Sequence, residues 1–220
     1  MENSRDDTLR LAREFAAKGE PDGWFEEFYA RAGGDIDKVY WADLEPGPHL
    51  VAYLERRPAP EGGRAVTIGC GLGDDAECLA AARYGTVAFD ISPAAIDMCV
   101  RRYADTAVDY RVADLFDLPA DWARSFDLVY ECNTIQILTG DNRDRALQAM
   151  VDLVKPGGVI LVSCRSRDEG EGLDAWPLAL DRNEIEGFVR AGLVEEEFVA
   201  YDDTQEPPVP HFFAVYRRPA

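Results

Sequence analysis

Lysine is scarce in this sequence. Only Lys18, Lys38 and Lys155 occur among 220 residues, and basic residues as a whole are outnumbered by acidic ones, 23 to 42. The net charge of −19 repels a polyphosphate, whose binding depends on Lys and Arg contacts. None of the lysines follows a glycine in the phosphate-loop pattern of nucleoside triphosphatases. We therefore expect neither a nucleic-acid partner nor a Walker-type ATPase.

Paired cysteines and long apolar runs are also lacking. The cysteines are odd in number, have no CxxC spacing and are accompanied by two histidines: Cys70, Cys78, Cys99, Cys132, Cys164, His49 and His211. This pattern favours neither a zinc site nor a disulfide framework, and free thiols are typical of a reducing cytoplasm. No run approaches the roughly 18 apolar residues of a membrane span, and the opening MENSRDDTLR is unlike a signal peptide. We expect a cytoplasmic protein with no membrane partner.

The sequence contains enough hydrophobic residues to form a buried core. Hydrophobic residues make up 47% of the chain and charged residues 30%, as in soluble globular domains. At about 150 residues per domain, the length allows one domain with an elaboration. The Pro- and Gly-rich segment 57–63 separates a helical N-terminal stretch from the rest. We predict a helical lid over 1–57 and a main domain over 58–220.

Apolar runs and helical patterns alternate beyond this segment. Strands are predicted at 65–68, 86–89, 108–112, 127–130 and 158–163, and helices at 75–83, 93–103, 142–154 and 181–190, the last opened by Asp181 and Glu184 as a capping box. Such alternation predicts a parallel sheet covered on both faces. Two further strands, 194–201 and 211–216, have no helix between them and are predicted to form an antiparallel hairpin at the sheet edge.

A glycine-rich turn, Gly69-Cys70-Gly71-Leu72-Gly73, follows the first strand, where ligands of open α/β sheets bind. A dinucleotide-binding turn would have a third glycine at position 74, but two carboxylates, Asp74 and Asp75, follow Gly73 instead. They repel a pyrophosphate at a helix N-terminus. The turn favours a cofactor without phosphate, the alternative being a purely structural turn.

Acids also follow the second and third strands. Asp90 is placed to accept hydrogen bonds from ribose hydroxyls, although it could instead cap the helix at Pro93, a role open to Ser92 as well. Asp114 could accept a base amine while Leu115 covers the ring, and its alternative role is to start a turn. Together the two acids indicate a nucleoside.

These segments resemble, in order, the motifs of class I S-adenosylmethionine-dependent methyltransferases: 68–73, 88–93, 112–119, 126–129 and 153–161. The resemblance covers residues 64–218. It implies a Rossmann-like three-layer sandwich with a mostly parallel seven-stranded sheet, its last strand antiparallel. It also implies S-adenosylmethionine as cofactor, S-adenosylhomocysteine as product, and a set of cofactor-binding residues: Gly69, Cys70, Gly71, Gly73, Asp75, Asp90, Ile91, Asp114, Leu115 and Trp41.

Within the class, segments 69–75 and 130–136 resemble the thiopurine and tellurite-resistance methyltransferase-like branch, whose substrates include thiols and other soft nucleophiles. Segment 39–48 resembles one that lies over the cofactor in such enzymes, and Trp41 in it could equally be a packing residue. The sequence departs from the family at Thr67, where an acid often helps hold the methionine ammonium. Asp74 or Asp75 could supply that charge, or Asp75 could cap its helix.

The sequence predicts a methyltransferase acting on a small nucleophile. A thiolate would need little base catalysis, whereas an amine or hydroxyl would need a base. Glu131 is the first candidate for orienting the acceptor or removing its proton, with bonding of the loop backbone as its alternative. Asn133, Arg165 and His211 are candidate acceptor-binding residues, the last two having structural alternatives. No GxSxG elbow supports a serine hydrolase.

Two other functions stay open at this point. One is a sensor or binding module that keeps the cofactor fold without methylating, because fold does not establish function. The other is a protein methyltransferase, which the net charge does not exclude. The acceptor and the oligomeric state do not follow from the sequence.

Overall fold

Apolar and β-branched runs form one seven-stranded sheet in the computed structural model, which describes residues 5–20, 22–138, 140–171 and 178–220. The strands are β1 (Arg64–Ile68), β2 (Gly85–Asp90), β3 (Asp109–Val112), β4 (Phe126–Cys132), β5 (Val154–Arg165), β6 (Val194–Asp202) and β7 (Pro210–Arg217). All seven lie where strands were predicted. β5 begins four residues earlier than expected, because Val154 already pairs with Phe126 of β4.

The strand order is β3-β2-β1-β4-β5-β7-β6. The first five strands are parallel to their neighbours, and β7 is antiparallel to both β5 and β6. This confirms a mostly parallel sheet with a reversed last strand. The terminal hairpin does lie at the sheet edge, but β7 inserts between β5 and β6, so β6 is the outermost strand.

Eight α-helices and three short 3-10 helices lie in the described ranges: α1 (Arg5–Ala17), α2 (Gly23–Ala32), η1 (Ile36–Lys38), α3 (Pro48–Arg56), α4 (Asp74–Ala81), α5 (Pro93–Arg102), η2 (Ala120–Trp122), η3 (Ile135–Ile137), α6 (Gly140–Leu153), α7 (Arg182–Ile185) and α8 (Gly187–Arg190). Within the N-terminal stretch the sequence also predicts a second helix that opens at Pro21-Asp22, and Pro21 lies outside the described residues.

Two of the predicted helix starts are confirmed by their caps. The Ser92 hydroxyl accepts a hydrogen bond from Ala95 N, and Asp181 and Glu184 form the full capping box. The helix predicted over 181–190 is wrong as one element. It is interrupted at Glu186, whose ψ of −5° departs from the helical value of about −42°.

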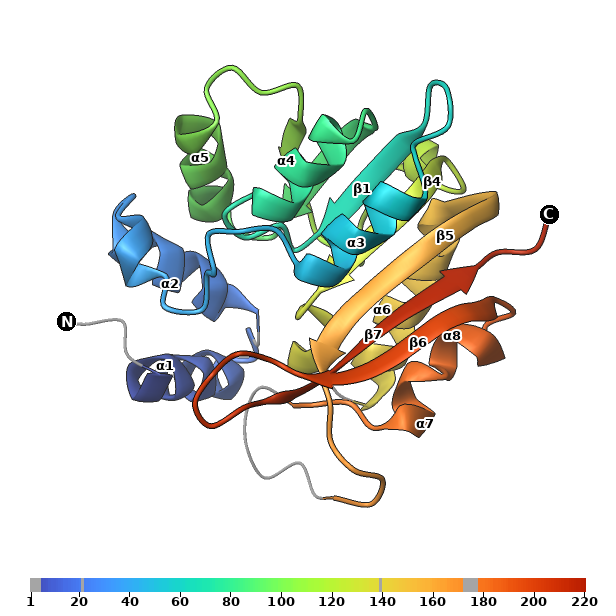
Figure 1. Ribbon diagram of the computed structural model, residues 1–220. Coiled ribbons are helices and arrows are strands. Elements are labelled where there is room, and N and C mark those ends of the chain that lie inside the picture. The colour runs from blue at the N-terminus through green and yellow to red at the C-terminus, as the bar shows by residue number, and fades with distance from the viewer. Residues whose placement is uncertain (1–4, 21, 139, 172–177) are drawn as a thin grey trace.

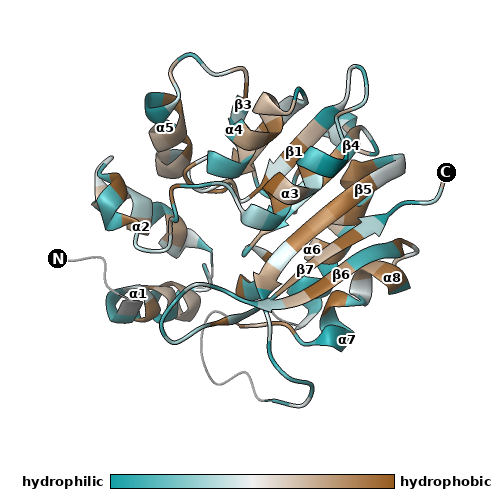
Figure 2. Cartoon of the chain, in the orientation of Figure 1, coloured by the Kyte–Doolittle hydropathy of each residue, from teal (hydrophilic) through white to brown (hydrophobic). Residues whose placement is uncertain are grey.

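Helices cover both faces of the sheet (Figure 1). On one face α3 and α4 pack on β1, β4 and β7 through a cluster that includes Leu50, Tyr53, Leu79 and Phe213. On the other face α6 and α8 pack on the sheet through Leu147, Met150 and Phe188 among others. Figure 2 shows the hydrophobic colour concentrated on the central strands, β5 above all. The three-layer sandwich is therefore confirmed.

The N-terminal helices α1 and α2 pack elsewhere. They form a cluster of their own with Leu72 of the glycine turn and with Ala95 and Met98 of α5. In Figure 1 they lie on the side toward which the arrow of β5 points, that is, at the carboxyl ends of the parallel strands. Of the predicted lid over 1–57, α3 packs on the sheet face, so only the part before it can act as a cover. The boundary at 57 stays a prediction.

Candidate functional site

The glycine turn between β1 and α4 has a backbone that other residues would strain. Gly69, Gly71 and Gly73 have φ of 58°, 53° and 90°. A Cβ on Gly69 would lie 2.4 Å from Thr134 Oγ1, and one on Gly73 would lie 2.4 Å from the Tyr110 hydroxyl. Glycine is needed at both positions for conformation and for space. Cys70 between them is buried.

Asp90 is held against this turn. Its Oδ2 accepts a hydrogen bond from Gly71 N at 3.1 Å, and its Oδ1 accepts one from Ser92 N at 3.0 Å. Burial raises the pKa of Asp90 to about 6, and the two backbone donors oppose the rise. A carboxylate can accept about four hydrogen bonds, so both oxygens keep acceptor capacity. Ile91, the next residue, is exposed.

Of the two acids after Gly73, only one faces the rest of the site. Asp74 pairs with Arg102 at 2.7 Å and accepts from the Tyr103 hydroxyl. Asp75 Oδ1 accepts from Gly47 N at 2.8 Å, and burial raises the pKa of Asp75 to about 6. Asp75 is not a helix cap, the N-cap being Gly73. Asp75 is therefore the better candidate for the acid that Thr67 does not supply.

Asp114 and Leu115 follow β3. Asp114 is exposed, and its Oδ1 accepts from Phe116 N at 2.8 Å, the contact of a turn-forming aspartate. Burial and, to a smaller extent, the charge of Asp114 raise the pKa of Asp22, which indicates that the residue before α2 lies close to this turn. Leu115 packs against the core cluster. The turn contact uses Oδ1 of Asp114 and leaves Oδ2 with acceptor capacity.

Trp41 belongs to an aromatic cluster that lies next to the glycine turn. Its ring stacks on Phe28 at 3.9 Å and is hydrogen-bonded to the Tyr29 hydroxyl. That hydroxyl lies 3.4 Å from where a Gly71 Cβ would be. The aromatic cluster of α2 and the following segment therefore lies directly on the glycine turn.

Glu131 at the end of β4 is fully buried. Its Oε1 accepts from Ile135 N at 3.1 Å and so holds η3, while Oε2 has no partner among the described residues. Burial raises the pKa of Glu131 to about 8. The group is thus mostly protonated at neutral pH, which argues against the proton-removing role considered from the sequence and favours its alternative, bonding of the loop backbone.

The three candidate acceptor residues gather near the ends of β4 and β5. Asn133 is exposed, with a φ of 62°, and its backbone N–H bonds Ser163 O. Arg165 pairs in register with His211 of β7. His211 Nδ1 is bonded to Val209 O at 2.8 Å and the side chain is buried, which favours the structural alternative for His211.

Sequence reasoning missed a group beside them. His49 of α3 lies 4.3 Å from Tyr201 and 5.0 Å from Phe213, ring centre to ring centre. Tyr201 in turn shares a 3.3 Å hydrogen bond with Ser163. These residues come from four elements far apart in the chain, and no local pattern joins them.

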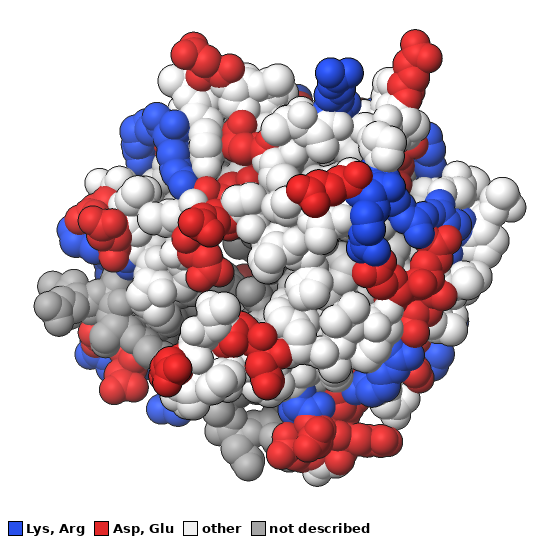
Figure 3. Space-filling view, viewed as in Figure 1, with Lys and Arg blue, Asp and Glu red and all other residues white. Residues whose placement is uncertain are grey.

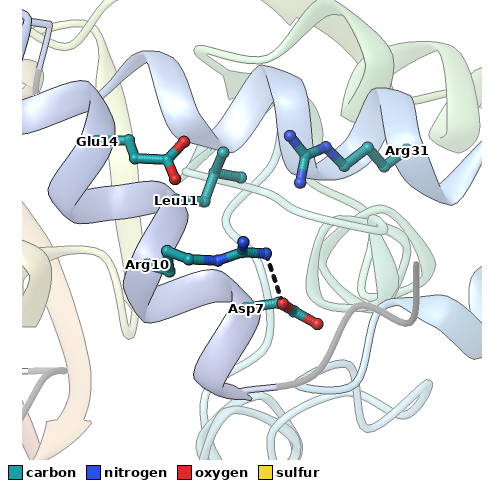
Figure 4. A pocket seen from close by; sticks show the side chains of 5 residues that line it. All are labelled: Asp7, Arg10, Leu11, Glu14 and Arg31. Carbon is teal, nitrogen blue, oxygen red and sulfur yellow. Dashed lines mark hydrogen bonds and ion pairs between the residues drawn. The ribbon is translucent and has the colours of Figure 1, made fainter.

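A shallow groove of about 150 Å³ lies apart from all these residues. Its lining comes from α1 and α2 alone, with Arg10 bonded to Asp7 at 2.7 Å (Figure 4): Asp7, Arg10, Leu11, Glu14 and Arg31. It contains no predicted site residue. The described residues hold no group of three or more His, Cys, Asp or Glu side chains placed for a metal ion. None of the helices in the described ranges has the length and apolar character needed to traverse a bilayer.

The hydrogen-bond acceptors of the site suit a cofactor that carries hydroxyl groups and positive charge. Acidic side chains lie across the middle of the face between the N-terminal helices and the sheet (Figure 3). Arg102, which also bonds Leu72 O of the turn, is neutralised by Asp74. Carboxylates accept from hydroxyl and ammonium groups and repel phosphate. Asp75 and Asp90 therefore fit the ammonium and ribose of S-adenosylmethionine, which carries no phosphate.

Known proteins resemble this chain at three levels. Residues 65–158 match the family model of the methyltransferase domain. The cypemycin N-terminal methyltransferase of Streptomyces sp is 30% identical over 147 residues, 63% of this chain and 59% of that protein. The probable thiol methyltransferase 2 of Arabidopsis thaliana is 25% identical over 203 residues, 90% of this chain and 85% of that protein.

The crystal structure of the N-methyltransferase NodS from Bradyrhizobium japonicum WM9 in complex with S-adenosylhomocysteine has a TM-score of 0.66 at 20% identity, over 84% of this chain and 97% of that one. At that identity the likeness concerns the fold. The alignment with the cypemycin enzyme covers less than two thirds of that protein. The family match spans the glycine turn, Asp90, Asp114 and Glu131. Residues 65–158 therefore match a methyltransferase domain, and the fold is that of the NodS structure.

Proposed function

We propose that the protein is an S-adenosylmethionine-dependent methyltransferase that acts on a small-molecule nucleophile, with a thiol as the favoured class. The observation that carries the proposal is the contact of Gly71 N with Asp90, which joins the glycine turn to the acid at the end of β2. This contact supports the proposal that the glycine turn and Asp90 together bind a nucleoside cofactor.

The cofactor would be held by residues of the turn and by three acids. Asp90 would accept from the ribose hydroxyls, Asp75 would face the ammonium, and the second oxygen of Asp114 would accept from the base amine. Tyr29 and Trp41 would cover the turn. Bound S-adenosylmethionine supplies a methyl group that its sulfonium has already activated.

The protein's task is then to align the acceptor and exclude water. Alignment of reactants can supply roughly 7–11 kcal/mol of a barrier. The acceptor would lie at the carboxyl ends of β4 and β5, where Asn133 and Arg165 stand. A thiol is favoured because the similarity to the probable thiol methyltransferase 2 of Arabidopsis thaliana extends over 90% of this chain.

The test is turnover with acceptors of different classes. The purified protein is incubated with S-adenosylmethionine and matched alkyl thiols, amines and alcohols, and S-adenosylhomocysteine release is measured. Release with thiols above the level without acceptor supports the proposal. Binding of the cofactor with no release for any small acceptor would instead indicate a binding module or an enzyme of macromolecules.

A further inference from the structure

A histidine, His49, lies on the α3 face of the sheet, at the carboxyl ends of β5 and β6. The His49 ring stacks on Phe213, 18° from parallel, and leans on Tyr201. Within the described ranges no hydrogen bond or ion pair joins either ring nitrogen of His49 to another residue. The side chain is only partly buried. The ring is therefore positioned by packing, while its nitrogens stay available.

The Tyr201 hydroxyl and the Cys132 thiol in this region remain protonated at neutral pH. Ser163 Oγ bonds the Tyr201 hydroxyl at 3.3 Å, and Ser163 pairs in register with Cys132 at the end of β4. Burial raises the pKa of the Cys132 thiol and of Tyr201 above their ordinary values. Neither is a base at neutral pH. His49 is thus the member of this group that can accept a proton.

The start of α3 ties His49 to the glycine turn. Gly47, two residues earlier, donates its N–H to Asp75 at 2.8 Å, and a Cβ there would lie 2.8 Å from the Tyr130 hydroxyl. Asp75 is the second residue of α4, directly after the turn. The contact of Gly47 with Asp75 therefore anchors the start of α3, the helix that carries His49, beside the residues that follow the glycine turn.

The surroundings keep the imidazole neutral. Burial lowers the pKa of His49 below its usual 6.5, the charge of Glu197 on β6 opposes this, and that of Arg56 on α3 adds to it. Arg56 and Glu197 pair with each other at 3.1 Å, so their effects on the ring largely cancel. The β7 neighbour, Phe213, is apolar, and the remaining β6 neighbour, Tyr201, is uncharged.

Resting on the proposed methyl transfer, we propose that His49 accepts the proton of a small thiol bound between the rings of Tyr201 and Phe213 and the glycine turn. The thiol sulfur forms the bond to the methyl carbon as the bond from that carbon to the sulfonium breaks, its electron pair remaining on the departing sulfur. The thiol proton passes to the unprotonated ring nitrogen of His49 and from there to water. A thiol, with a pKa of about 8.5, is within reach of an imidazole, whereas an alcohol is too weak an acid.

The first experiment compares wild type with His49→Asn, His49→Ala and the control Glu55→Gln, an exposed acid on the same helix. We expect kcat/KM for a thiol to fall about a hundredfold in both His49 variants, the magnitude typical of a lost base. S-adenosylhomocysteine affinity should stay within twofold of wild type. Added imidazole should restore activity to His49→Ala, and the acidic limb of the wild-type pH profile should vanish in His49→Asn.

The second readout is the histidine itself. The chain has two histidines, so proton NMR gives two imidazole signals, which a His211→Asn variant assigns. The His49 signal should titrate below pH 6.5 and should shift when butanethiol is added to the complex with S-adenosylhomocysteine. Thiol turnover with an unchanged rate and pH profile in His49→Asn would overturn the inference and leave the proposed function intact. Failure of wild type to bind S-adenosylhomocysteine would overturn the proposed function itself.

Discussion

Gly71 donates its backbone N–H to the carboxylate of Asp90 at 3.1 Å, and so the glycine turn after β1 and the acid at the end of β2 form one surface. Ser92 N holds the other carboxylate oxygen at 3.0 Å. An acid fixed on two sides by backbone donors is preorganised to receive further donors from a ligand.

Replacing Asp90 should weaken the cofactor site. A hydrogen bond to a charged group contributes about 1.5–3 kcal/mol, so Asp90→Asn should lower S-adenosylhomocysteine affinity about tenfold to a hundredfold. Calorimetric titration measures this. Asp97→Asn, an exposed acid on α5, is the matched control and should bind as wild type does. An unchanged dissociation constant in Asp90→Asn would remove Asp90 from the site.

Glu131 should make stability depend on pH. Its folded pKa of about 8 lies above the ordinary 4.5, so between these values the folded state holds a proton that the unfolded state has released. Its contribution to the free energy of unfolding is full below about pH 4.5 and is lost as the pH rises toward 8. Glu131→Gln should therefore gain stability relative to wild type between pH 5 and 8. Denaturant unfolding at several pH values checks this, with Glu55→Gln as the exposed control, and parallel pH curves for Glu131→Gln and wild type would contradict the role of burial.

Gly69 should tolerate no side chain. A left-handed conformation costs a non-glycine residue roughly 1–2 kcal/mol, and a Cβ at Gly69 also meets Thr134 Oγ1. Gly62 has a similar φ of 66° with no atom within 4 Å, so Gly62→Ala isolates the conformational cost. Thermal unfolding should show a larger loss for Gly69→Ala than for Gly62→Ala, partly recovered in Gly69→Ala/Thr134→Ala. Equal losses at the two glycines would show that the contact with Thr134 is unimportant.

The lid should be fastened by Glu26. Its Oε2 accepts from the Ser92 hydroxyl at 2.7 Å and from Ala94 N at 2.9 Å, which joins α2 to the start of α5 beside Asp90. Glu26→Ala should loosen α2 and weaken S-adenosylhomocysteine binding about tenfold, because a charge-assisted contact is lost. Glu27→Ala, which breaks only the surface pair with Arg31, is the control. Should both variants bind equally tightly, α2 would not act as a cover.

Local chemistry made much of the fold predictable. The capping box of Asp181 and Glu184 and the run of apolar strands each depend on neighbours in sequence, and each is confirmed. The insertion of β7 between β5 and β6 and the break at Glu186 depend on packing that a local pattern does not contain.

The residues of the candidate site were likewise predictable only in part. Asp90 could be assigned to the candidate site from its position at the end of a predicted strand. The choice between Asp74 and Asp75 as the acid for the ammonium group rests on the ion pair of Asp74 with Arg102, which only the structure reveals. Whether Glu131 carries a proton depends on burial, and the group of His49, Tyr201 and Ser163 comes from α3, β6 and β5. Contacts between segments that lie far apart in the chain produce no regular residue spacing from which they could be predicted.

A calorimetric titration of the protein with S-adenosylhomocysteine, run beside NADH, tests whether the glycine turn and Asp90 form an S-adenosylmethionine site. We predict saturable binding of S-adenosylhomocysteine with one site per chain and no heat of binding for NADH, because the acids at Asp75 and Asp90 suit a ligand without phosphate. Binding of NADH, or of neither ligand, would contradict the claim that the glycine turn and Asp90 form an S-adenosylmethionine site.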